Sequence, residues 1–337
     1  MAQKRDRLRI AVIGLGEAGA TFAKGFLVSG LFDVVGYDAR IENPSTAEGI
    51  RARAESFGIA ACASLEQASR DADIILSAVT ASAARKVAET AATFLKRGQF
   101  YFDINSISPS AKRRNAVAIE RSGAAYVEGA VMGPVGPVGI KVEILLAGAC
   151  AAELAAMLTP AGMNLKVVAT AIGKASAIKM CRSIVIKGIE ALVVECFLTA
   201  RRYGIEDTII QSLNSSFPGT DCERRDSYMM SRVLQHGRRR AAELREVATT
   251  IQEAVFIAPM APAAAEVQEW VAVVSPRTLG TNCLVFACTS SADIARIAVK
   301  LLPSIRARGF RFLEIGERTQ RAGAFEDCLL EHTFAER

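Results

Sequence analysis

Two groups of residues in this chain could take part in chemistry. One consists of three closely spaced glycines near its start, and the other is a lysine with its neighbours in a long helical pattern. The segment from Leu8 to Gly30 is an apolar strand-forming run, then Gly14, Gly16 and Gly19, then a helical pattern. This order of strand, G-x-G-x-x-G turn and helix is that of a dinucleotide-binding unit. The glycines permit the tight turn, the approach of backbone to a pyrophosphate and close helix packing, and the N–H groups at the helix start attract phosphates.

An acidic side chain follows the second predicted strand. The run at 33–37 ends in Asp38, 19 residues after Gly19, where a carboxylate accepts hydrogen bonds from an adenosine ribose. A negative charge there repels a 2′-phosphate, so we expect NAD to be preferred over NADP, although Arg40 could pair with that phosphate. The weaker alternative is a strand–helix turn of some other α/β protein. We expect cofactor contacts from Gly14, Leu15, Gly16, Glu17, Ala18, Gly19, Asp38, Val79, Thr80 and Asn105.

The lysine is Lys179. From Lys174 to Tyr203 the chain has no proline and one glycine, which predicts a single helix of about thirty residues and about 45 Å. Lys179, Ser183 and Lys187 are four apart and would share one face of this helix. A lysine on a long helix is normally solvated, so its spacing alone does not make it catalytic.

Polar residues also follow two predicted strands. Asn105 and Ser106 come just after the strand at 100–104, at the edge where doubly wound sheets bind ligands. The alternative is that they cap the turn and the helix that Ser108 and Pro109 open. The segment EGAVMGP at 128–134 lies at the end of the next strand, where strand-end packing is an equally good interpretation.

The first half of the chain alternates strand and helix patterns, which predicts an α/β fold with an N-terminal doubly wound (Rossmann) parallel sheet. An all-α domain built around the long helix follows it. We expect a Rossmann domain at 1–170, a helical substrate and dimerisation domain at 171–270, and a C-terminal segment of unknown role at 271–337. The later elements are expected as helices at 205–213, 221–234, 241–254 and 292–308 and strands at 283–288 and 310–315.

Composition excludes several classes of protein. The net charge of +6 is mild, and the basic clusters at 4–9, 112–114 and 238–240 have no interleaved aromatics, so we expect solvated faces and a small anionic substrate rather than nucleic acid. Eight scattered cysteines without a C-x-x-C pair, and no apolar leader, favour a cytoplasmic protein with reduced thiols. Neither histidine lies in a ligand cluster, so no metal is expected, and no apolar run is long enough to span a membrane.

In this order, the segments resemble the β-hydroxyacid dehydrogenase family, which includes 6-phosphogluconate and 3-hydroxyisobutyrate dehydrogenases. They are most similar to a bacterial branch assigned to phosphogluconate dehydrogenases, and the resemblance covers about residues 8–265. The segment DINSISP at 103–109 resembles the family's D-x-[NS]-[ST]-x-x-P. EGAVMGP resembles the substrate-binding D-A-P-V-S-G-G, and GKASAIKMCRS at 173–183 resembles G-x-G-x-x-x-K-x-x-x-N.

The resemblance implies an oxidoreductase that transfers a hydride between NAD(P) and a small 3-hydroxy acid or its semialdehyde. It implies that Lys179 is the general acid/base, and we expect Asn105 and Ser183 to orient the lysine and the substrate. A neighbouring cation, Lys187 or Arg182, would lower the pKa of the lysine towards the working range. The implied substrate contacts are Ser106, Met132, Gly133, Pro134 and His236.

The chain departs from the family pattern at four positions. Met132 and Pro134 stand where the family has serine and glycine, so a hydroxyl and an N–H donor are lost and a less polar substrate body is expected. Ala175 and Ser183 replace a glycine and an asparagine. His236 is expected at a junction between two helices, from which it would reach the substrate, or else it is a surface histidine.

Two other functions stay open. Imine reduction is performed by related folds, but those enzymes generally lack the catalytic lysine. The four departures leave room for a non-catalytic dinucleotide sensor. The sequence names neither the substrate nor whether decarboxylation follows oxidation.

The long helix is also rich in apolar residues on more than one face. A helix that is apolar all round should be buried on several sides, which predicts a homodimer through the helical domain. The residues concerned are Ile184, Val185, Ile189, Leu192, Val193 and Phe197.

Overall fold

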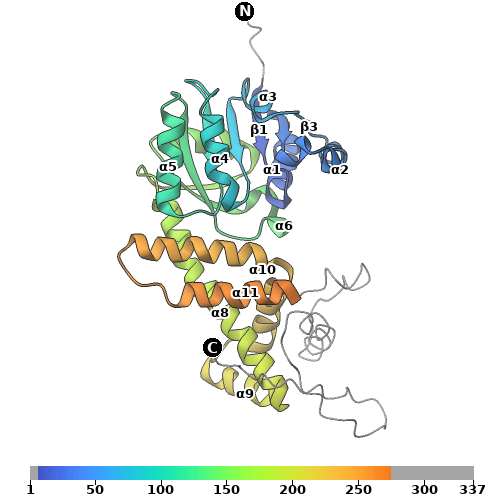
Figure 1. The fold of residues 1–337 in the computed structure, drawn as a ribbon, viewed down its shortest axis with the longest axis vertical. Helices are drawn as coiled ribbons and strands as arrows, with labels where there is room; N and C mark the ends of the chain where they lie inside the picture. Colours follow the sequence, from blue (N-terminus) through green and yellow to red (C-terminus); the bar gives the residue numbers. More distant parts are fainter. Residues whose placement is uncertain (1–6, 275–337) are drawn as a thin grey trace, which may run out of the picture. The chain divides into compact units, whose positions relative to one another are not determined.

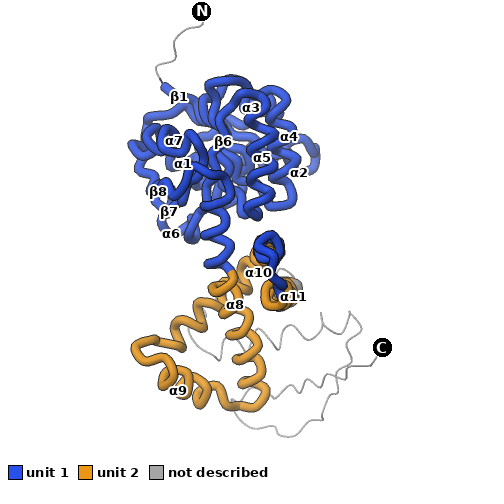
Figure 2. Tube along the Cα trace, turned by 90° about the vertical axis from the view of Figure 1, so that its left-hand side faces the viewer, with its two compact units in different colours: residues 1–183, 246–258 blue, residues 184–245, 259–337 orange. Residues whose placement is uncertain are grey.

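The computed structural model describes residues 7–274. They form two compact units: residues up to 183 together with 246–258, and residues 184–245 together with the described residues from 259 on (Figure 2). Two long helices, α8 (Lys174–Tyr203) and α10 (Cys222–Glu253), therefore contribute residues to both units. The elements expected at 283–288, 292–308 and 310–315 lie outside the described residues.

An eight-stranded sheet forms the centre of the first unit (Figure 1). Its order is β3-β2-β1-β4-β5-β6-β7-β8, and strands β1 to β6 are parallel, which confirms the predicted Rossmann sheet. The strands are β1 (Leu8–Ile13), β2 (Phe32–Tyr37), β3 (Ala60–Ala61), β4 (Ile74–Ser77), β5 (Phe100–Asp103), β6 (Ala125–Val131), β7 (Glu143–Ala147) and β8 (Asn164–Ala169).

Strand β7 is the exception to the parallel direction, because it pairs antiparallel with β6. The connection between them consists of short turns, including α6 (Val135–Val138) and the 3₁₀ turn at 139–141. A parallel connection needs a crossover of a dozen or more residues, usually a helix, so this shorter connection returns the chain in the opposite direction. Strand β8 is again parallel to its neighbour β7.

The helices of the first unit begin and end at recognisable signals. Ser108 accepts a hydrogen bond from the N–H of Ala111, and Pro109 is the first residue of α5, as predicted. Gly30 ends α1 with a φ of +68°, a conformation that glycine adopts without strain. The helices are α1 (Glu17–Ser29), α2 (Pro44–Ser56), α3 (Leu65–Ser69), α4 (Ala81–Ala91), α5 (Pro109–Glu120) and α7 (Ala151–Leu158). No element had been expected at 44–69.

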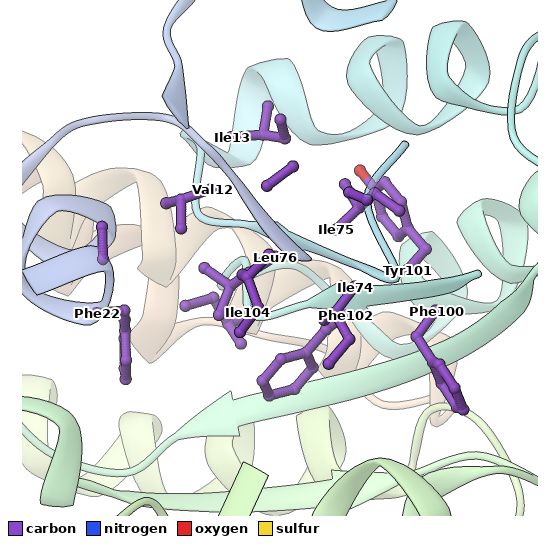
Figure 3. Packing of buried hydrophobic residues seen from close by; sticks show 14 of the residues in the cluster. Val12, Ile13, Phe22, Ile74, Ile75, Leu76, Phe100, Tyr101, Phe102 and Ile104 are labelled. Atoms are coloured by element: carbon purple, nitrogen blue, oxygen red, sulfur yellow. The ribbon is translucent and has the colours of Figure 1, made fainter. Parts of the chain in front are cut away.

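The core of the first unit is built from the strands that are buried on both faces. Ile75 on β4 and Phe102 on β5 are fully buried, and Phe22 of α1 belongs to the same cluster (Figure 3). Helices α4 and α5 lie side by side against the sheet (Figure 1). A rigid sheet of this kind fixes the loops at its carboxyl edge.

One charged pair lies inside this core and shows that the predicted solvated face at 112–114 is wrong for Lys112, whereas Arg113 and Arg114 are exposed. Lys112 is fully buried, and its Nζ lies 2.9 Å from a carboxylate oxygen of Asp103 and 2.6 Å from the Asp103 carbonyl oxygen. Tyr126 and Asn115 donate to the other carboxylate oxygen over 2.8 and 3.2 Å. Burial, and then the charge of Asp103, raise the pKa of Tyr126 well above 10. Asp103, the first residue of the DINSISP segment, is therefore a buried hydrogen-bonding centre.

The second unit is helical. Helix α8 has the bounds predicted for the long helix. The other helices of this unit are α9 (Glu206–Ser216), α11 (Met260–Val274) and most of α10. No described helix is long and apolar enough to cross a bilayer. The buried core consists of Val193, Val194, Phe197, Met230, Val233 and Val271.

The helix junction expected at His236 is wrong, because α10 runs unbroken through it. The glycine that suggested a junction has a packing role. A Cβ on Gly237 would lie 2.4 Å from the carbonyl oxygen of Gln268, so glycine lets α11 approach α10 closely. His236 is consequently a mid-helix residue.

Charged residues also lie inside the second unit. Arg240, expected on a solvated face, is buried, and its Nε donates to Glu190 over 2.8 Å. Gln268 donates to the same carboxylate over 3.1 Å. Lys187 lies 2.9 Å from Glu243, so its charge has a compensating partner.

Candidate active site

The glycine turn leaves an open face at the start of α1. Gly14 has a φ of +92°, and a Cβ on it would lie 2.5 Å from the Ala78 carbonyl oxygen. A Cβ on Gly19 would lie 1.8 Å from the Gly14 oxygen, so both positions require glycine. A Cβ on Gly16 would meet nothing within 4 Å, and Gly16 caps α1 without a side-chain hydrogen bond. The turn thus has the space and the N–H groups that a pyrophosphate requires.

Asp38 is fixed against this turn. Its Oδ2 accepts a hydrogen bond of 3.0 Å from the N–H of Leu15, and Arg40 donates from Nε and Nη2 to its two oxygens, each over 2.8 Å. Burial alone would raise the pKa of Asp38, but the bonds from Arg40 and Leu15 outweigh it and hold that pKa below its ordinary value. The carboxylate and the guanidinium that were expected to decide cofactor choice are therefore bonded to each other.

Asn105 joins the ends of two strands. Its Oδ1 accepts from the N–H of Val79 over 2.7 Å, and its Nδ2 donates to Ser77 over 3.0 Å. The side chain is 4% exposed. These contacts hold the end of β4 against the end of β5, and direct contact of Asn105 with cofactor or substrate remains a prediction. Thr80 lies at the start of α4, with its Oγ1 3.1 Å from the Ser82 hydroxyl.

The structure brings Lys179 and Ser106 together. The Nζ atom of Lys179 donates to the Oγ of Ser106 over 2.5 Å, so the first turns of α8 and the loop after β5 meet at these side chains. Lys179 is half-buried, and Ser183, one turn later, is 8% exposed. A lysine in this position is partly removed from water and has a hydroxyl partner, as a proton-transferring group requires.

Glu128 is a site residue that the sequence reasoning missed. It is fully buried on β6, and its carboxylate accepts from the N–H groups of Ala175 and Ser176 over 2.7 and 3.4 Å and from the Ser176 hydroxyl over 3.2 Å. It therefore caps the N-terminus of α8 from another element. An acidic residue within the apolar run AYVEGAV was the available signal, because a buried carboxylate needs donors.

Two further glutamates were missed. The N–H of Ser108 donates to Glu246 over 2.7 Å, and the N–H of Ser110 donates to Glu253 over 3.0 Å. Both carboxylates come from the end of α10 that belongs to the first unit. They stabilise the start of α5, which follows the loop that carries Ser106.

The segment after β6 contacts α8 at a second point. The carbonyl oxygen of Met132 accepts from Nη1 of Arg182 over 3.0 Å, and its N–H donates to the Glu143 carbonyl. Gly133 and Pro134 follow it and are exposed. Among the predicted substrate residues, Ser106, Met132, Gly133 and Pro134 belong to the first unit, as Lys179 does, and His236 belongs to the second.

Within the described residues, no three side chains of His, Cys, Asp or Glu gather as a metal site.

Two family profiles match parts of the chain. Residues 9–106 match the family described as NADP oxidoreductase coenzyme F420-dependent, and residues 200–271 match a domain of unknown function, DUF1932. The first match covers the glycine turn and the segment that carries Asn105 and Ser106. The second lies in the helical part of the chain.

Solved structures extend the likeness to most of the chain. A conserved hypothetical protein from Sinorhizobium meliloti 1021 is 35% identical, covers 87% of this chain and 96% of its own, and has a TM-score of 0.66. A conserved protein of unknown function, reported as structurally similar to 3-hydroxyacid dehydrogenases, is 30% identical over 78% of this chain and 96% of its own, with a TM-score of 0.61.

More distant structures share the fold. The 3-hydroxyisobutyrate dehydrogenase of Mycobacterium tuberculosis, with L-serine, is 18% identical over 79% of this chain and 94% of its own, with a TM-score of 0.64. An imine reductase of Streptomyces aurantiacus is 19% identical over 78% of this chain and 93% of its own, with a TM-score of 0.52. The eight-stranded sheet followed by long helices is thus a recurrent architecture.

Proposed function

The chain belongs to the β-hydroxyacid dehydrogenase family, and from this premise we propose that it is an NAD(P)-dependent dehydrogenase or reductase of a small 3-hydroxy acid or its semialdehyde. The observation that carries the proposal is the 2.5 Å contact between Lys179 and Ser106, in the unit that also holds the open glycine turn. Family membership supports a dinucleotide-dependent oxidoreductase, and the lysine supports action on a CH–OH group.

The residues of the first unit have complementary roles in this reaction. The backbone around Gly16 would hold the pyrophosphate of a dinucleotide, and Asp38 would accept from the adenosine ribose. A bound nicotinamide supplies the acceptor or donor of the hydride. Lys179 would take the substrate hydroxyl proton at Nζ during oxidation and return it during reduction, while Ser106 orients the hydroxyl.

Lys179 must lose its proton near neutral pH to act as a base. A neighbouring cation favours the neutral amine. Lys187 is a poor source of that field, because Glu243 compensates its charge at 2.9 Å. Arg182 fits better, since its contact on the segment after β6 is with a neutral carbonyl oxygen. Ser183, one helical turn from Lys179, would orient the amine.

Turnover assays test the proposal. Formation of NADH or NADPH is followed with 3-hydroxypropanoate, 3-hydroxyisobutyrate and related acids, and the reverse reaction with their semialdehydes. Turnover of at least one acid supports the proposal. Dinucleotide binding without turnover would favour a sensor. Reduction of cyclic imines without turnover of any acid would favour an imine reductase, the function of a protein with the same fold.

We also propose a homodimer through the helical unit. Val185 and Leu192 are 58% and 54% exposed, and their seven-residue spacing places them on one face of α8, whereas Val193 and Phe197 are buried. A second copy would cover these exposed side chains. Sedimentation at micromolar concentration is the test, and a stable monomer would contradict the proposal.

A further inference from the structure

We infer that Arg182 binds the carboxylate of the substrate, an inference that rests on the proposed function and specifies its substrate site. Arg182 follows Lys179 by three residues on α8. Side chains at this spacing are neighbours on a helix surface, with Cβ atoms about 5–6 Å apart. A small molecule that offers its hydroxyl to Lys179 can therefore place a second group near Arg182.

The guanidinium is held on the segment at 128–134, whose resemblance to the family motif implies contact with substrate. Nη1 of Arg182 donates to the carbonyl oxygen of Met132 over 3.0 Å. This bond uses one of five N–H donors and, because a carbonyl is neutral, leaves the positive charge uncompensated by this contact. The bond also fixes the direction of the planar group, and a preorganised guanidinium binds a carboxylate through two parallel hydrogen bonds.

The sequence explains why an arginine is needed here. Met132 has no side-chain donor and Pro134 has no N–H, whereas the family pattern that this segment resembles has a serine and a glycine at these two positions. A carboxylate bound beside them requires donors from elsewhere. Arg182 supplies both hydrogen-bond donors and positive charge, so the substrate carboxylate binds to a side chain of α8 rather than to the loop after β6.

The substrate that fits these residues has a hydroxyl at one end and a carboxylate at the other. The hydroxyl faces Lys179 and Ser106, and the carboxylate faces Arg182, which fits a short 3-hydroxy acid. The neutral amide of the same acid has the same shape but no charge. Wild-type protein should therefore bind the acid more tightly than the amide.

Binding to the NADH-loaded protein, which cannot take a hydride from the acid, is measured by calorimetry, with 3-hydroxypropanoate and 3-hydroxypropanamide as probes. Arg182→Gln, which removes the charge but keeps a polar side chain, should weaken binding of the acid about 10- to 100-fold and leave binding of the amide nearly unchanged. Arg182→Lys should restore part of the loss, since it keeps the charge without the fork. The ratio of the two dissociation constants would not change through a general loss of structure.

Arg85→Gln is the matched control, because Arg85 is an exposed arginine on α4 that pairs with Glu89. It should leave the ratio unchanged. A wild-type protein that binds the acid no better than the amide, or an Arg182→Gln variant with the wild-type ratio, overturns the assignment. If the acid binds through Arg182 but is not turned over, the proposed reaction is wrong and the assignment of Arg182 stands.

Discussion

A carboxylate oxygen of Glu128 lies 2.7 Å from the backbone nitrogen of Ala175, so a side chain from strand β6 caps the helix that carries Lys179. Glu128 is fully buried, and its charge is stabilised by the N–H groups and the positive dipole end of α8. Lys179 lies four residues after Ala175, which is about one turn along the helix. The cap therefore fixes the start of α8 and, through it, the position of the lysine relative to Ser106.

Glu128→Gln is expected to lower the free energy of unfolding by about 1–3 kcal/mol, because the N–H groups of Ala175 and Ser176 lose a charged acceptor. Turnover should fall as well, since the lysine is less firmly held. Urea unfolding and steady-state kinetics measure the two effects. Ser64→Ala is the control: Ser64 caps α3 through the N–H of Gln67, so its loss should reduce stability without reducing turnover. A Glu128→Gln variant with wild-type stability would show that the cap is dispensable.

Lys179→Ala should leave folding and NAD binding nearly intact, because the glycine turn holds the dinucleotide. Turnover should fall by about 10² to 10⁴, the usual contribution of a positioned proton-transfer group. Lys179→Arg should not restore it, since a guanidinium does not lose its proton at neutral pH. Lys174→Ala is the control, because Lys174 is exposed at the start of the same helix. Turnover of Lys179→Ala within a few-fold of wild type would remove Lys179 from the mechanism.

Lys112→Met should be strongly destabilising, by about 3–5 kcal/mol, because it leaves the carboxylate of Asp103 buried without its cation. The double variant Lys112→Met, Asp103→Leu should recover part of this loss, since neither charge remains. Chemical unfolding of the two variants and of wild type provides the comparison. Equal stability of Lys112→Met and wild type would mean that the hydrogen bonds from Tyr126, Asn115 and the Asn105 N–H support the carboxylate without the lysine.

The elements with a local signal were predictable. The bounds of α8 followed from an uninterrupted helical pattern. The glycine turn followed from the G-x-G-x-x-G spacing, because other backbone atoms approach Gly14 and Gly19 too closely to leave room for a side chain. The antiparallel direction of β7 has no signal in the strand's own residues, because it depends on the length of the connection from β6. The unbroken course of α10 was missed because Gly237 reads as a helix end, whereas its glycine is required by the approach of Gln268.

The site was predictable only where its residues lie in recognisable segments. Lys179 and Ser106 each belong to a motif, and the structure places them in contact. Glu128 and Lys112 were missed for a different reason. Each acts through a partner on another element, and nothing in the neighbouring sequence identifies that partner. For Glu128 a charged residue within an apolar strand was the signal, but it predicts the need for a partner and not its identity. Lys112 stands beside two exposed arginines and had no such signal.

Acid should weaken the attachment of β2 to the glycine turn. Because the pKa of Asp38 is lowered in the folded protein, its contribution to stability is complete above the pKa of an unfolded aspartate, about 4. It is lost as the pH falls through the lowered value. Unfolding of wild type and Asp38→Asn across this range tests the expectation: the advantage of wild type should be largest at neutral pH and should disappear in strong acid. A difference independent of pH would exclude the charge of Asp38 as its cause.

The choice between NAD and NADP should depend on how Asp38 and Arg40 interact with the 2′-group of the adenosine ribose. Both oxygens of Asp38 accept hydrogen bonds from Arg40, and one is also bound to the N–H of Leu15. The Arg40 N–H also donates to this carboxylate, over 3.1 Å, so four donors already occupy its two oxygens. The ribose 2′-hydroxyl of NAD would take the place of one Arg40 side-chain donor, whereas the 2′-phosphate of NADP would face the negative charge. We therefore expect a higher kcat/KM with NAD.

Asp38→Ser should shift the ratio of the two kcat/KM values towards NADP by about 10- to 100-fold, because the repulsion is removed and Arg40 becomes available to a phosphate. Adding Arg40→Gln to that variant should reverse most of the shift, which separates the two contributions. A clear preference of the wild-type protein for NADP would show that Arg40 and not Asp38 controls the site.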